Sequence, residues 1–232
     1  MQKGIKFRIY PNREQKNFIH QTLGCCRLIY NRGLAMRKES YEEGKKIGYT
    51  QTSAMLTELK RQEEFAFLKA ADSIALQQSL RDLDRSFVNF FQKRASYPTF
   101  KSKHNRFQSY RTVNQKDNIR IVGRYIKLPK LGFVKIRQSM EVGKINHVTV
   151  EYTPAGKYFA VLNVDFEPEP RPNAGGTIGI DVGIKAFYSD SNGNTVSNPR
   201  YLERSMRKLI REQRRLSRKQ KDSHNRGKQR LR

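Results

Sequence analysis

A single strand pattern at the start of the chain, followed by a long helical pattern, most constrains how this sequence can fold. Residues 4–10 alternate in character, with Ile5, Phe7 and Ile9 on one face and polar residues on the other, as in a half-buried β-strand. Pro11 ends the pattern. A strand without a neighbouring strand must find its partner elsewhere, so we expect it to join a sheet formed later in the chain.

The residues after this strand are typical of helices up to about residue 105. Asn12 and Gln15 have the spacing of a capping box, and Gly44 is placed to end the helix that they begin. In a second, amphipathic helix the apolar residues step by four, three, four and three positions: Leu76, Leu80, Leu83, Phe87 and Phe90. This spacing predicts a helix face that is buried against other elements.

The spacing of apolar residues changes from a helical to a strand pattern between residues 106 and 170. Short alternating segments separated by glycine, proline and asparagine predict six antiparallel strands, at 107–113, 118–122, 125–128, 133–137, 144–152 and 158–167. We therefore predict a small antiparallel β-barrel made of residues 1–10 and 106–170, with the helical residues 11–105 inserted into it. Prolines and glycines then predict a linker at 171–175.

The last region, residues 176–232, begins with a buried apolar strand predicted at 177–182 and continues with a hairpin around Asn192-Gly193. A helix is predicted from about Arg200, and residues 200–232 hold 14 basic and 3 acidic residues. The fold class expected from the whole pattern is a multidomain α+β protein.

Charge indicates the kind of partner. The chain of 232 residues has 47 Lys and Arg against 21 Asp and Glu, a net charge of +26, and nucleic acid is the usual polyanion that neutralises such an excess. Ribosome-associated, chromatin-like and membrane-surface proteins remain alternatives. No apolar run reaches the roughly 20 residues of a membrane span, and the N-terminus lacks a signal-peptide pattern, so we expect a cytoplasmic protein.

Cys25 and Cys26 are adjacent, which predicts buried, reduced thiols and no zinc site.

Asp181 is the residue most suggestive of chemistry, because a carboxylate within an apolar strand is costly unless it is paired or bound to a metal. Gly179 and Gly183 keep its surroundings open to a bulky polyanion. A strand bearing an acid, then a hairpin and a helix, matches the opening of an RNase H-like sheet, where such an acid holds a divalent metal. The alternative is a strand-end aspartate that accepts hydrogen bonds from the backbone or an arginine.

Several stretches give the sequence a specific resemblance. They lie in matching order over nearly all of the chain: residues 7–12 with Gln15, 23–31, 97–101 with 109–110, 126–132 and 179–185. In these stretches the sequence resembles the OrfB/TnpB-type insertion-sequence transposases, which are RNA-guided DNA endonucleases related to type V CRISPR effectors. The resemblance implies a wedge β-barrel, an inserted helical recognition lobe, and a RuvC-like nuclease domain that starts near residue 176.

The resemblance also implies partners and contacts. They are a guide RNA from the end of the transposable element and a double-stranded DNA target with a short flanking motif. The motif-binding positions are Tyr49, Ser53 and Gln77, and Ser73 stands where related proteins have a lysine. Ordinary polar surface and helix capping are the alternative for these positions. Nucleic-acid backbone contacts are expected from Lys101, Lys103, Arg106, Arg111, Arg207, Arg211, Arg214, Arg215 and Arg218.

The RuvC-like site of this family resembles a centre of three carboxylates and two Mg²⁺ ions, in which Asp181 matches the first acid. No later acid stands in the second or third context, and the CxxC pairs of the family's zinc-binding insertion are absent. We therefore expect a chain truncated before its catalytic centre is complete, with no tight Mg²⁺ binding and no cleavage by itself. Two alternatives are a non-cleaving RNA-guided DNA binder or repressor, and a generic basic RNA-binding protein.

Overall fold

The opening strand lies inside a seven-stranded antiparallel sheet. The computed structural model describes residues 1–105, 107–137, 140, 142–168 and 175–231. It divides into two units, Met1–Glu167 and Pro168–Arg232. The first unit holds the seven-stranded sheet and the helices inserted after its first strand, and the second holds a small sheet and two helices.

In the first unit, β1 (Gln2–Tyr10) pairs with β7 on one side and β5 on the other, so the expected pairing of the opening strand with later strands is observed. The strand order is β2-β6-β7-β1-β5-β4-β3. The bounds of the later strands are β2 (Gln108–Val113), β3 (Arg120–Val122), β4 (Tyr125–Leu128), β5 (Gly132–Arg137), β6 (Ile145–Tyr152) and β7 (Tyr158–Asp165).

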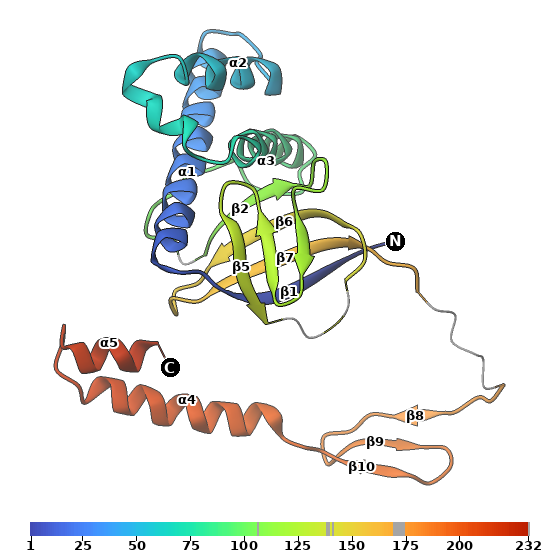
Figure 1. Cartoon of the computed structure of the whole chain (residues 1–232). Helices are drawn as coiled ribbons and strands as arrows, with labels where there is room; N and C mark the ends of the chain where they lie inside the picture. Colours follow the sequence, from blue (N-terminus) through green and yellow to red (C-terminus); the bar gives the residue numbers. More distant parts are fainter. Residues whose placement is uncertain (106, 138–139, 141, 169–174, 232) are drawn as a thin grey trace. The chain divides into compact units, whose positions relative to one another are not determined.

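The sheet is a curled half-barrel, so the small barrel expected from the sequence is only partly formed (Figure 1). Its edge strands β2 and β3 do not pair with each other in the described part of the chain. The sheet does not need to close because helices cover its inner face and complete the hydrophobic core. Side chains of the sheet such as Ile136 and Leu162 belong to the same buried cluster as Ile19 and Leu76 from the helices, so the inner face is covered without closure.

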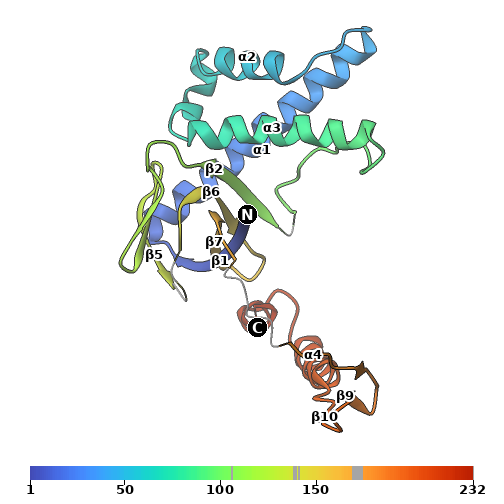
Figure 2. The same cartoon turned by 90° about the vertical axis from the view of Figure 1, so that its right-hand side faces the viewer.

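Three helices follow β1: α1 (Arg13–Glu42), α2 (Tyr49–Leu59) and α3 (Ser73–Phe91), with a 3₁₀ segment at Glu63–Lys69. The predicted capping box is present, because Asn12 Oδ1 accepts from the Gln15 N–H at 2.8 Å and Gln15 Oε1 accepts from the Asn12 N–H at 3.0 Å. Figure 2 shows α3 running across the sheet beside β2. The amphipathic spacing of α3 is confirmed, since Leu76, Leu80 and Leu83 are fully buried.

The crossing of α1 and α3 is close because Gly33 faces α3. A Cβ atom at Gly33 would lie 2.9 Å from Leu80 Cδ2 and 3.0 Å from Leu83 Cδ2. About two turns earlier in α1, the Ser79 hydroxyl of α3 donates to the Cys26 carbonyl at 2.7 Å. Cys25 and Cys26 are buried and free, as expected, and burial raises the pKa of both thiols.

The second unit has β8 (Ile180–Asp181), β9 (Ala186–Asp190), β10 (Thr195–Ser197), α4 (Tyr201–Ser217) and α5 (His224–Arg230). Its sheet has the order β10-β9-β8. The buried strand expected at 177–182 is wrong in length and burial: only Ile180 and Asp181 form a strand, and both are exposed. No other element covers either face of β8 within the described residues of this unit, and in that part no apolar side chain is buried.

None of the described helices combines the length and apolar character needed to cross a bilayer.

Candidate nucleic-acid interface

A groove in the first unit brings together two residues that the sequence selected for different roles. Its volume is about 710 Å³. It is lined by residues of β1, α2, α3, β2 and β6, among them one acid, Asp84. Tyr49, at the start of α2, and Arg111, in β2, both line it. Arg81 and Arg85 from α3 line it as well, and the Arg81 guanidinium carbon lies 4.8 Å from the centre of the Tyr49 ring. The groove therefore presents an aromatic ring beside several cations.

Arg111 is also part of the fold. Its guanidinium pairs with Asp82 of α3, and its Nε atom is buried without a hydrogen-bond partner among the described residues. This pair connects β2 to α3, so Arg111 has a protein partner where the sequence predicted a phosphate. Nearby, burial lowers the pKa of His147, and the charge of Arg111 lowers it further while Asp82 opposes the shift.

The other two positions expected to bind the motif lie close to the groove in sequence but do not line it. Ser53 is one turn after Tyr49 in α2, and its carbonyl accepts from the Thr57 hydroxyl at 3.2 Å. Gln77 is exposed in the second turn of α3, four residues after Ser73. Lys60 donates to the Ser73 hydroxyl at 3.4 Å, so an ammonium group lies beside the position where the family resemblance implies a lysine.

The basic loop after α3 is held against α1. The Lys101 ammonium lies 4.0 Å from the centre of the Tyr30 ring, and burial lowers the pKa of that ammonium. The Lys103 carbonyl accepts from Gln108 at 2.6 Å, and the Lys103 side chain is exposed. Arg106, expected to contact phosphate, lies outside the described residues. The Lys101 side chain thus packs against Tyr30 of α1, whereas the Lys103 side chain is accessible to a ligand.

Asp181 stands apart from other acids. Its register partner in β9 is Ser189, and the described residues contain no group of three or more His, Cys, Asp or Glu that could hold a metal ion. Asp190 is bound within its own turn, where hydrogen bonds from the Asn194 side chain and from backbone N–H groups lower its pKa. One exposed carboxylate does not supply the several oxygen ligands that two Mg²⁺ ions need, so the residues present do not fit that metal centre.

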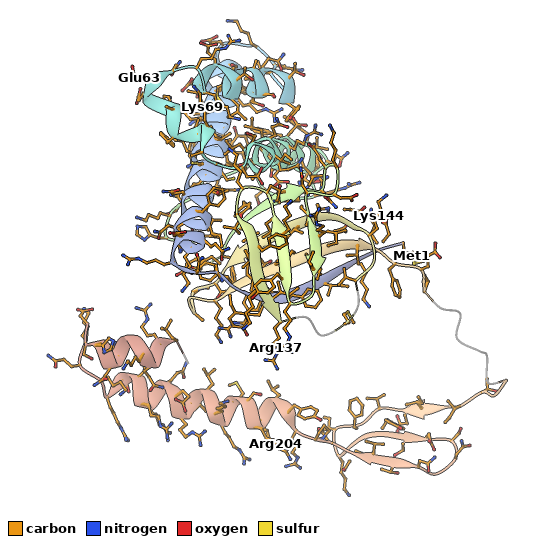
Figure 3. The ribbon with its side chains drawn as sticks, viewed as in Figure 1. Met1, Glu63, Lys69, Arg137, Lys144 and Arg204 are labelled. Carbon is orange, nitrogen blue, oxygen red and sulfur yellow. The ribbon has the colours of Figure 1, made fainter. Side chains whose placement is uncertain are left out.

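The five arginines expected on the last long helix all fall on α4 or its C-terminal cap. Arg207 pairs with Glu203 at 3.5 Å, and Arg215 pairs with Glu212 at 3.0 Å. Figure 3 shows the side chains of α4 projecting from several sides of the helix. The helix also carries exposed apolar residues that the sequence analysis did not single out: Leu202, Met206, Leu209 and Ile210.

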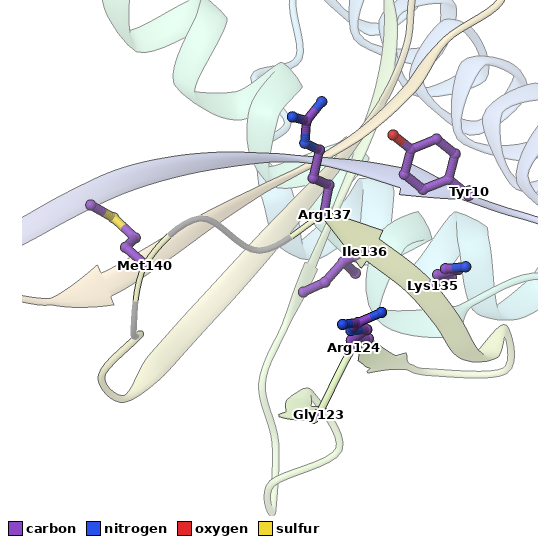
Figure 4. A pocket seen from close by; sticks show the side chains of 7 residues that line it. All are labelled: Tyr10, Gly123, Arg124, Lys135, Ile136, Arg137 and Met140. Atoms are coloured by element: carbon purple, nitrogen blue, oxygen red, sulfur yellow. The ribbon is translucent and has the colours of Figure 1, made fainter.

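Cations outside the expected site residues line a second concave surface: Lys135 and Arg137 of β5, and Arg124 of the turn between β3 and β4 (Figure 4). A signal was available, because residues 118–137 contain six Lys and Arg and no acid. The alternation of these residues predicts strands, and the absence of acids marks the surface as positively charged.

Comparison with known proteins identifies the family. Residues 1–46 match the OrfB IS605 model described as "Helix-turn-helix domain", and residues 147–232 match the OrfB IS605 model described as "Probable transposase". The chain is 36% identical over 99% of its length to a "Putative RNA-guided DNA endonuclease" of Streptomyces pristinaespiralis. It is 35% identical over 98% of its length to the "Putative RNA-guided DNA endonuclease InsQ" of Escherichia coli (strain K12).

These matches place the protein among transposon-encoded proteins. The chain belongs to the OrfB/TnpB-type insertion-sequence transposase family. It spans 58% and 56% of the length of the two relatives. A "Cryo-EM structure of CRISPR-Cas12f Ternary Complex" aligns with 94% of this chain and 55% of that chain, at 13% identity and a TM-score of 0.40.

Proposed function

We propose that this chain binds a guide RNA and a double-stranded DNA target that carries a short flanking motif. The observation that carries the proposal is the groove between α2, α3 and β2, where Tyr49 and Arg111 lie with Arg81 and Arg85. Aromatic rings and guanidinium groups are the side chains that contact bases and phosphates. The names of the two relatives, each an RNA-guided DNA endonuclease, support the same class of partner.

Within this proposal, residues 1–10 and 106–170 are the wedge, residues 11–105 are the recognition lobe, and residues 176–232 are part of a RuvC-like domain. Tyr49, Ser53 and Gln77 read the flanking motif. Lys60, which donates to Ser73, supplies the cation that related proteins carry at position 73 itself. The exposed arginines of α4 and the side chain of Lys103 contact the nucleic-acid backbone, and the protein is associated with the nucleoid when bound.

The proposed role of this chain is binding rather than cleavage. Asp181 is the one residue that matches a RuvC-like acid, and the acids around it are not gathered with it in the described residues. We therefore propose a non-cleaving RNA-guided DNA binder, because the described carboxylates near Asp181 are too few to hold the metal ions that cleavage needs. A generic basic RNA-binding protein is the competing function, favoured only by the charge of +26.

Sequencing the RNA that co-purifies with the full chain tests the proposal. We expect one discrete RNA species to dominate, and we expect the complex to retain DNA duplexes with a defined flanking motif from a library randomised at those positions. Tyr49→Ala should weaken motif selection, whereas Tyr41→Ala, at an exposed tyrosine of α1, should leave it unchanged. Recovery of random cellular RNA, together with no motif preference, would overturn guided binding and favour the generic RNA-binding protein.

A further inference from the structure

The outer face of β1, β5 and β4 carries tyrosines and cations in aligned rows. In the sheet register, Lys135 of β5 lies between Tyr10 of β1 and Tyr125 of β4. Arg8 and Arg137 face each other in the next row. The residues between them, Ile9 and Ile136, are buried in the core. Because side chains alternate along a strand, the two tyrosines and the three cations share the solvent face.

This face is concave. A pocket of about 880 Å³ is lined by Tyr10, Arg124, Lys135 and Arg137 among others, and Figure 4 shows these side chains coming from β1, from β5 and from the turn between β3 and β4. The Tyr10 and Tyr125 side chains are 44% and 48% exposed. Their rings are therefore available to a ligand.

The charge of this face is positive. Residues 118–137 contain no acid, and β1 contains none. Within the described part of the chain, which leaves out Glu141, no ion pair engages Arg124, Lys135 or Arg137. The acids on the outer side of this sheet, Glu151 and Asp165, lie on β6 and β7. An anion at the pocket would meet cations from β5 and from the turn between β3 and β4, and no carboxylate of the described residues lines the pocket.

Arg8 positions the Tyr10 ring before a ligand binds. The guanidinium carbon of Arg8 lies 5.2 Å from the centre of the Tyr10 ring. The Nε atom of Arg8 is buried without a hydrogen-bond partner among the described residues. The ring of Tyr10 is thus held against a cation at the edge of the pocket, so less conformational freedom is lost when a ligand stacks on it.

We propose that this surface, the Tyr10–Tyr125 face, binds unpaired nucleotides of a nucleic-acid strand. Bases stack on Tyr10 and Tyr125, and phosphates meet Lys135, Arg137 and Arg124. Neighbouring strands are about 4.8 Å apart, so the backbone positions of the two tyrosines lie roughly 10 Å apart, with that of Lys135 between them. A duplex does not fit this arrangement, because the faces of its bases are covered by their neighbours, whereas single strands offer them to aromatic platforms.

This inference rests on the proposed function, since it assumes a nucleic-acid ligand, but it can fail independently. The test measures fluorescence anisotropy of the full chain with single-stranded RNA, single-stranded DNA and a duplex of equal length. Stacking on one ring is worth about 1–3 kcal/mol, or roughly 5- to 150-fold. We expect Tyr10→Ala and Tyr125→Ala each to weaken single-strand binding at least about fivefold, and duplex binding to change by less than about twofold.

Matched variants separate stacking from folding. Tyr10→Phe keeps the ring and should bind as the original chain does, and Tyr201→Ala removes an exposed tyrosine of α4 and should also bind normally. Lys135→Ala combined with Arg137→Ala should reduce the slope of log affinity against log salt by about 1.4 for a single strand. Loss of affinity for either single strand supports the face. A loss confined to RNA or to DNA also identifies which strand binds there.

Two outcomes would overturn the inference. One is that both tyrosine variants bind single strands as tightly as the original chain, which leaves the proposed function standing. The other is that single strands and duplexes lose affinity equally. If the original chain binds no nucleic acid at all, the proposed function and this inference both fail.

Discussion

The side chain of Asn31 in α1 forms hydrogen bonds with both the backbone C=O and the backbone N–H of Lys101. The Asn31 amide donates to the Lys101 carbonyl at 3.0 Å, and the Asn31 side-chain oxygen accepts from the Lys101 N–H at 2.8 Å. The two residues are 70 positions apart in sequence, and each lies in one of the stretches that carry the family resemblance. Two motifs that are separate in the sequence are therefore parts of one connection between α1 and the loop after α3.

Replacing Asn31 tests this connection. Asn31→Ala removes a donor and an acceptor, and each hydrogen bond contributes about 0.5–1.5 kcal/mol net. We expect the free energy of unfolding, measured by urea denaturation, to fall by about 1–2 kcal/mol. Hydrogen exchange at the Lys101 amide should accelerate. Gln21→Ala, at an exposed position of α1, is the control and should change stability by less than about 0.5 kcal/mol. Unchanged exchange at Lys101 would contradict the role of Asn31.

The two glycines inside α1 should respond to alanine in opposite directions. Gly33→Ala places a methyl group 2.9 Å from Leu80 Cδ2 and 3.0 Å from Leu83 Cδ2, so we expect destabilisation by about 1–3 kcal/mol from overpacking. At Gly24 the nearest atom is Arg27 Nη2 at 3.9 Å. Gly24→Ala should therefore stabilise the chain by about 0.5–1 kcal/mol, through the better helix propensity of alanine. The same denaturation measurement checks both, and equal effects would refute the close crossing.

His147 should make stability depend on pH near neutrality. Burial, and then the charge of Arg111, lower its pKa from the usual 6.5. The unfolded chain therefore binds a proton at His147 before the folded chain does, and stability falls as the pH drops below about 6.5. We expect His147→Gln to reduce this loss between pH 7 and pH 5.5, as followed by urea midpoints. His104→Gln, at an exposed histidine, should not reduce it.

Asp181 should not hold Mg²⁺ tightly in this chain. A lone exposed carboxylate leaves most of the coordination shell to water. We expect calorimetric titration with Mg²⁺ to show no saturable site, and Asp181→Asn to titrate like the original chain. Incubation with guide RNA and a matched DNA target should give no cleavage. Mg²⁺-dependent cleavage that disappears in Asp181→Ala would prove this expectation wrong.

The second unit should be much less protected than the first. In its described residues no apolar side chain is buried, while Ile19, Leu80 and Leu162 of the first unit are 0–1% exposed. Hydrogen exchange measured by mass spectrometry should therefore be fast in α4 and β8–β10, and slow in α1, β6 and β7. Adding RNA should slow exchange in α4, because its arginines would be neutralised. Slow exchange in α4 of the free chain would contradict this.

Local features of the fold could be predicted from the sequence. The cap at Asn12, the buried face of α3 and the strand at residues 125–128 depend on neighbours within a few positions, and the structure has them as expected. Chain geometry alone produces these patterns, since periods of 3.6 and 2 follow from the helix and the strand themselves.

The candidate site was less accessible to sequence reasoning. Tyr49 and Arg111 were selected for different roles, and only the packing of α2, α3 and β2 brings them into one groove. Asp82, which holds Arg111, was not singled out, because an acid on a helix face resembles ordinary solvent-exposed charge. The aligned row of Tyr10, Lys135 and Tyr125 depends on strand register, which alternation within each strand does not specify.

The sequence by itself determined the order of most helices and strands, which faces are apolar, the excess of positive charge and the resemblance to a family. The tertiary structure decided which of those faces are covered. Leu76 and Asp181 both sit in segments with an apolar pattern, yet Leu76 is fully buried and Asp181 is exposed. The reason is that burial requires a second surface: α1 and the curled sheet supply one for α3, whereas β8 pairs with β9 alone in the described residues.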